Sequence, residues 1–120
     1  MIFALIFTHW IADFVCQTDD MAKNKSKSNK WLGKHVLAYM CVLSLFAIVA
    51  GFTIPGRYWM SFVLINGVAH FIVDYFTSRI SSRLWAKGEV HNFFVVIGLD
   101  QAIHMATLYG TYTYIFKALT

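Results

Sequence analysis

The stretch HVLAYMCVLSLFAIVAGFTI, residues 35–54, decides the fold, because it contains no aspartate, glutamate, lysine or arginine. An α-helix crosses the apolar core of a bilayer with about 20 such residues. The run ends at Pro55-Gly56, and the next apolar run begins at residue 58. Since a Pro-Gly pair marks a tight turn, the two runs are predicted to form a hairpin of helices.

Further apolar runs lie on both sides of this hairpin. The candidate spans are residues 2–18, 35–54, 58–76 and 93–116. The whole chain of 120 residues is 58% hydrophobic and 13% charged, whereas soluble domains carry about 25% charged residues. This composition excludes an ordinary soluble domain. It predicts an all-α, integral-membrane four-helix bundle in which residues 1–120 form one four-span domain.

The basic residues predict how the bundle is oriented. Eight of the ten lysines and arginines lie in the connectors 19–34 and 77–92. Because lysine and arginine are enriched in cytoplasmic loops, both connectors are predicted to lie in the cytoplasm and both termini outside it. The expected partner is the lipid bilayer of the cell inner membrane, which the chain crosses several times. Nucleic acid is not an expected partner, since membrane topology explains the basic residues better.

Three of the predicted spans carry ionisable side chains at helical spacing. The groups are His9-x3-Asp13-x3-Gln17 in the first span, Asn66-x3-His70-x3-Asp74 in the third and Asp100-x3-His104 in the fourth, with His35 at the start of the second. Residues four apart lie on one face of a helix. An ionisable group inside a bilayer costs about 2.5–3.5 kcal/mol on insertion scales. Because the pairs fall at one depth, near the cytoplasmic boundary, they predict a single polar pocket inside the bundle.

Imidazole and carboxylate groups on facing helices are the ligands with which helical bundles bind Zn, Mn or Fe. The expected donors are His9, Asp13, His70, Asp74, Asp100 and His104, with His35 as a seventh candidate. They suffice for one divalent metal, or for two metals that share bridging carboxylates. Asp100 or His35 is the expected general base.

Five other polar residues are expected around these ligands. Gln17, Asn66 and Gln101 are predicted to support the ligands by hydrogen bonds, while Ser78 and Arg79 are predicted to contact an anionic headgroup or phosphate. Each has a structural alternative. Interhelical hydrogen bonds explain the amides, and a charge that snorkels to the interface explains Arg79.

The pattern favours metal-dependent hydrolysis of a membrane-associated substrate, with a lipid phosphoester as the first expectation. A bound metal generates hydroxide from water and stabilises the developing oxyanion. Two alternatives stay open: proton or metal-ion handling in a transporter component, and structural hydrogen bonds in a non-catalytic membrane interaction protein. A homo-oligomer also stays open, although the glycines form no GxxxG pair.

The segments HWIADFVCQTDDMAKNKS, NGVAHFIVDYFTSR and FFVVIGLDQAIH resemble the hallmark segments of DUF3307, a small integral-membrane family of bacteria and phages described as a domain of unknown function. The resemblance covers nearly the whole chain. It implies a helical membrane protein and no established activity. The matching residues are His9, Asp13, Gln17, His70, Asp74, Ser78, Arg79, Asp100, Gln101 and His104. A looser likeness to membrane-bound metal-dependent hydrolases with His-x3-Asp ligands is an analogy of fold.

Overall fold

The computed structural model describes residues 2–49 and 55–117, and within these ranges the chain is helical with no strand. The elements are α1 (Ile2–Trp10), a π-helical turn η1 (Ile11–Val15), α2 (Asp19–Asn24), α3 (Asn29–Val49), α4 (Gly56–Ala86) and α5 (Val90–Lys117). The predicted all-α helical bundle is confirmed.

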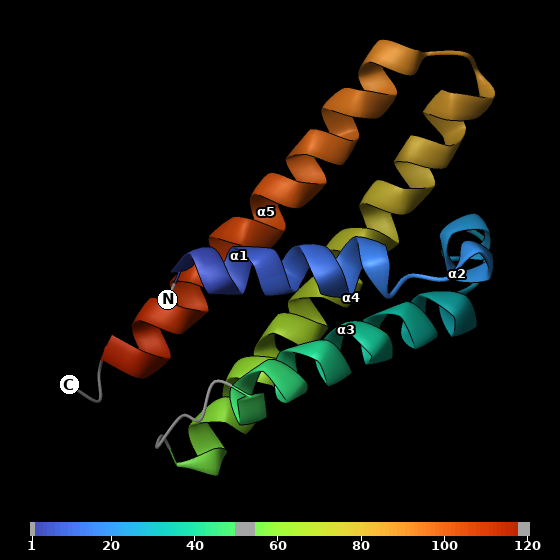
Figure 1. Ribbon diagram of the computed structural model, residues 1–120. Helices are drawn as coiled ribbons and strands as arrows, with labels where there is room; N and C mark the ends of the chain where they lie inside the picture. The colour runs from blue at the N-terminus through green and yellow to red at the C-terminus, as the bar shows by residue number, and fades with distance from the viewer. Residues whose placement is uncertain (1, 50–54, 118–120) are drawn as a thin grey trace.

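Helices α4 and α5 form a long antiparallel hairpin, with α1 and α3 lying across it (Figure 1). The turn of this hairpin requires a glycine, because Gly88 has a φ of 72°, a left-handed conformation that often follows the last turn of a helix. Helix α3 packs on α4, and α1 contacts both α3 and α5. All four helices therefore meet around the middle of the hairpin.

Two helices extend well beyond the predicted spans. Helix α3 begins at Asn29 rather than residue 35, and α4 continues to Ala86 rather than residue 76. Both extensions carry polar side chains. A prediction from hydropathy therefore ended the two spans before the helices themselves end. The end of the predicted second span, residues 50–54, lies outside the described residues.

Three helices, α3, α4 and α5, are long and apolar enough to cross a membrane. The first apolar run forms a shorter helix, Ile2–Val15. Its last turn is a π-helix, in which the N–H of Cys16 donates to the carbonyl of Ile11 at 2.9 Å. Because the helix stops at Val15, Gln17 does not continue the helical face of His9 and Asp13, contrary to the predicted spacing.

An apolar core fills one end of the bundle. It includes Leu43 of α3, Phe62 of α4, and Leu108 and Phe116 of α5, all buried. The rings of Phe62 and Phe116 lie 5.5 Å apart between centroids. The buried ionisable residues, among them His70, Asp74 and Asp100, lie closer to the turn between α4 and α5 than this apolar core does.

Gly67 of α4 lies against the side chain of Met40 of α3. A Cβ atom at this position would lie 2.5 Å from Sδ of Met40 and 2.7 Å from its Cγ. The contact is one turn before His70 on α4, so a larger side chain here would displace Met40 next to the polar residues.

We expect Gly67→Val to lower the free energy of unfolding by about 1–3 kcal/mol, because overpacking forces neighbouring side chains and backbone to shift. Thermal unfolding in detergent measures the change. Gly98→Val is the matched control, since a Cβ at Gly98 of α5 has nothing within 4 Å. Adding Met40→Ala to Gly67→Val should restore part of the loss; equal instability of the Gly67 and Gly98 variants would contradict the close contact.

Candidate metal centre

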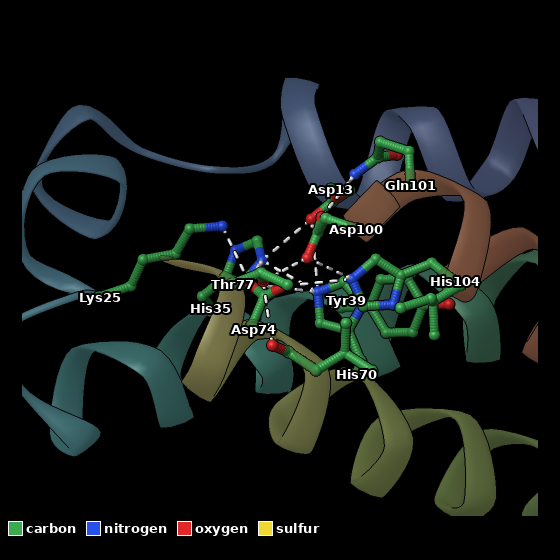
Figure 2. A network of polar contacts seen from close by, with 12 residues as sticks. Asp13, Lys25, His35, Tyr39, His70, Asp74, Thr77, Asp100, Gln101 and His104 are labelled. Atoms are coloured by element: carbon green, nitrogen blue, oxygen red, sulfur yellow. Dashed lines mark hydrogen bonds and ion pairs between the residues drawn. The ribbon is translucent and has the colours of Figure 1, made fainter. Parts of the chain in front are cut away.

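Four elements bring the buried histidines and aspartates into one cluster (Figure 2). Helix α4 presents His70 and Asp74 on one face, one turn apart, and α5 presents Asp100 and His104 in the same way. The π-helical turn η1 supplies Asp13. Helix α3 adds a fourth contribution, His35, and all six side chains are buried.

The tightest group comprises Asp13, His35, His70 and Asp74, and each offers one ligand atom within 4.8 Å of the others. Nε2 of His35 lies 3.0 Å from Oδ1 of Asp13, 3.1 Å from Nε2 of His70 and 3.3 Å from Oδ2 of Asp74. Nε2 of His70 lies 3.3 Å from the same Asp13 oxygen and 3.7 Å from the same Asp74 oxygen. Four ligand atoms from α3, α4 and η1 thus face a common centre.

Hydrogen bonds alone do not satisfy this arrangement. Each imidazole nitrogen presents either a proton or a lone pair, while an ionised carboxylate presents only lone pairs. If both Nε2 atoms carry protons, two N–H groups oppose each other at 3.1 Å. If one carries a lone pair, that lone pair faces the oxygens of Asp13 and Asp74. A cation between the four atoms would convert every one of these contacts into a ligand bond.

A second group adjoins the first and comprises Asp13, Asp100 and His104. Nε2 of His104 lies 3.4 Å from Oδ1 of Asp100 and 3.0 Å from Oδ1 of Asp74. Asp74 therefore directs one oxygen to each group, and Asp13 belongs to both. Asp13 and Asp74 therefore have the placement of carboxylates that two neighbouring metal sites would share.

Polar side chains around the ligands hold the carboxylates in place. The amide of Gln101 donates to Oδ2 of Asp13 at 2.7 Å and to Oδ2 of Asp100 at 3.0 Å. Thr77 donates its hydroxyl to Oδ1 of Asp100. Ligand carboxylates in metal sites are commonly oriented by such neighbours, and Gln101 has the supporting position predicted from the sequence.

His9 lies beside the two ligand groups, with its Nε2 3.7 Å from Oδ2 of Asp13. Its Nδ1 is 3.3 Å from the hydroxyl of Tyr39, and its Nε2 is 3.2 Å from Oε1 of Gln101. The ring of Tyr39 in turn stacks on His70, with centroids 4.2 Å apart. The geometry gives His9 an orienting position, whereas the sequence predicted it as a ligand.

Two predicted contributors, Asn66 and Arg79, lie elsewhere. Asn66 donates to Thr111 at 2.8 Å and to the carbonyl of Phe62, so it joins α4 to α5 away from the cluster. Arg79 donates to Asn29 at 2.7 Å and to the carbonyl of Tyr75.

The remaining two predicted contributors, Gln17 and Ser78, make no hydrogen bond to the cluster through their side-chain oxygens in the described part of the chain. Oε1 of Gln17 and Oγ of Ser78 are buried and have no hydrogen-bond partner within residues 2–49 and 55–117. Ser78 is one turn beyond Asp74 on α4, whereas Gln17 follows the end of the first helix.

Lys25 is the functional residue that the sequence did not single out. It caps α2, and its Nζ forms an ion pair with Oδ2 of Asp74 at 2.9 Å. The side chain is 19% exposed. Nothing in the spacing of the connector KNKSKSNK separates this lysine from its neighbours, because its position depends on how α2 folds back. Tyr39 had a detectable signal, since it lies four residues after His35 and thus on the same face of α3.

The whole chain, residues 1–120, matches the family model of DUF3307, described as a protein of unknown function. The chain belongs to the DUF3307 family. Membership confirms the resemblance inferred from the three motifs. No curated protein and no solved structure matches the chain, so the chemistry of this DUF3307 protein has to be argued from its own site.

The cluster geometry predicts different effects for two fully buried histidines. His35→Gln should abolish tight divalent-metal binding, because it removes an atom that faces the common centre. His9→Gln should weaken binding by about 10–100-fold, the usual effect of removing a group that orients ligands. Titration of the purified, metal-stripped protein with Zn²⁺ measures both affinities. Equal losses in the two variants would place His9 among the ligands.

Proposed function

We propose that this DUF3307 protein is a multi-pass protein of the cell inner membrane that binds a divalent metal at Asp13, His35, His70 and Asp74, and that it hydrolyses a membrane-associated substrate there. The observation that carries the proposal is the convergence of these four ligand atoms, with five of their mutual separations between 3.0 and 3.7 Å. Ligands about 2.0–2.2 Å from a tetrahedral ion lie roughly 3.3–3.6 Å apart.

The balance of charge supports a divalent ion. Asp13, Asp74 and Asp100 are all buried, and Lys25 is the cation paired with one of them. With the histidines neutral, three negative charges against one positive charge leave two to be compensated; the alternative source is protonation of His35 and His104, each of which contacts two of the carboxylates. Uncompensated buried charges are strongly unfavourable, and Zn, Mn or Fe in the divalent state would compensate both. Imidazole and carboxylate ligands suit each of these metals.

The surroundings of the metal group support hydrolysis. An ion held by all four groups needs a fifth position for water, and a water bound there becomes acidic enough to supply hydroxide near neutral pH. Asp100 is beside the group without belonging to its four ligands, and Thr77 and Gln101 hold its carboxylate in place. We assign Asp100 the role of general base. His35, the other base expected from the sequence, faces the metal centre and is assigned as a ligand instead.

The first test is metal content and turnover of the purified protein in detergent. We expect stoichiometric Zn, Mn or Fe by mass spectrometry, and release of phosphate or alcohol from lipid phosphoesters that stops after chelation. His70→Ala and Asp74→Ala should lose both the metal and the activity. His91→Ala is the matched control, because His91 is exposed at the start of α5. A folded protein that takes up no divalent metal on reconstitution would refute the proposal.

A second test concerns orientation. With the basic connectors in the cytoplasm, the three long helices carry the chain outwards, inwards and outwards, so the end of α5 should lie outside. A reporter such as alkaline phosphatase, active only outside the cytoplasm, should be active when fused after residue 120. The same reporter inserted at Gly88, in the turn between α4 and α5, should be inactive. The reverse pattern would contradict the proposed orientation.

A further inference from the structure

A cavity of about 550 Å³ lies between α2, α4 and α5, next to the metal group. One wall is polar and carries Lys23, Lys25, Ser78 and Ser81. No residue lining it is acidic in the part of the chain that the structure describes. The lining therefore suits a negatively charged group with many hydrogen-bond acceptors.

The opposite wall is apolar. It includes Trp85 at the end of α4 and Phe93, Phe94 and Ile97 near the start of α5. Trp85 and Phe94 are more than half exposed, so the cavity opens to the surface. A ligand that fills it needs an anionic part against the lysines and an apolar part against the aromatic rings.

The position of the cavity along the bundle fits the edge of a membrane. The molecule is 49 Å long, whereas the apolar core of a bilayer is about 30 Å thick. The polar residues after Asp74 lie at the end of α4 that the basic connectors place in the cytoplasm. Tryptophan and lysine are both favoured at the headgroup level.

Lys25 connects the cavity to the metal group. Lys25 lines the cavity, and its ammonium contacts Oδ2 of Asp74 at 2.9 Å. A lysine ammonium has three donors, so two remain for a ligand. Ser78 lines the same cavity one turn beyond Asp74, and its Oγ is buried and without a partner in residues 2–49 and 55–117. Arg79 does not line it, because its guanidinium is bound to Asn29 and Tyr75.

We propose that this cavity binds the phosphate headgroup of an anionic lipid, with Lys23 and Lys25 contacting the phosphate and the rings of Trp85 and Phe94 contacting the start of the acyl chains. The inference rests on the proposed function, because it gives the substrate of the metal site a chemical class and a binding position. Lys25 holds the phosphate beside Asp74, and hence within reach of the metal ligands.

The test measures lipid binding separately from metal binding and turnover. The full chain in phosphatidylcholine nanodiscs is titrated with phosphatidic acid, after chelation of metals, and the bound lipid is counted by native mass spectrometry. Diacylglycerol with the same chains tests the need for phosphate. Inorganic phosphate as competitor separates a lipid headgroup from a free phosphate. We expect one bound phosphatidic acid, no bound diacylglycerol, and no displacement by millimolar phosphate.

Two lysine variants and a matched control locate the site. Lys25→Gln should weaken phosphatidic acid binding about tenfold or more, the loss expected for one charge-assisted hydrogen bond. Lys23→Gln should weaken it in the same direction, and its exposed position keeps the fold unaffected if the Lys25 variant is unstable. Lys27→Gln, an exposed lysine of the same connector that does not line the cavity, should bind as the wild type does.

The possible results separate the two proposals. Equal binding by the Lys23, Lys25 and Lys27 variants, or equal binding of diacylglycerol, would overturn the headgroup site. Displacement by inorganic phosphate at the same affinity would overturn the lipid assignment. Metal binding with no lipid preference refutes this inference alone. Lipid binding that depends on Lys23 and Lys25 in a chain that takes up no metal refutes the proposed hydrolase and leaves the headgroup site standing.

Discussion

Two carboxylates, Asp13 and Asp74, are almost fully buried in a bundle whose outer surface is apolar, and the rest of the structure is arranged around them. A buried carboxylate is tolerated only with partners that neutralise it or donate hydrogen bonds to it. Asp74 has Lys25 and His104, while Asp13 has His35 and Gln101. These partners come from α3, from α5 and from the connector after α2, while Asp74 itself belongs to α4. The helices are therefore held in register by polar contacts as well as by apolar packing.

Much of this arrangement could be predicted from the sequence. Four apolar runs with one Pro-Gly break indicate helices, and a spacing of four residues places His70 with Asp74 and Asp100 with His104 on single helix faces. Both pairs lie where the spacing put them. The reason is geometric: α4 and α5 are regular over these segments, so periodicity in the sequence becomes position in space.

The remaining features depend on irregular structure, which periodicity does not encode. The π-helical turn ends the first helix before Gln17, and the fold of the connector after α2 determines that Lys25 reaches Asp74. Asn66 shows a different limit. It shares a face with His70 and Asp74, yet a distance of one turn along α4 was enough to pair it with Thr111 of α5 instead of the cluster.

The order in which the cluster residues occur along the chain has a consequence for biosynthesis. The group begins at Asp13 and is completed only by His104, near the end of α5. A nascent chain that has released α1 and α3 into the bilayer exposes an aspartate and two histidines without their later partners. Contacts between residues so far apart in sequence form late in folding. A metal bound there, as proposed, would add its binding free energy to that of the folded state, so that loading of the ion would favour completion of the bundle.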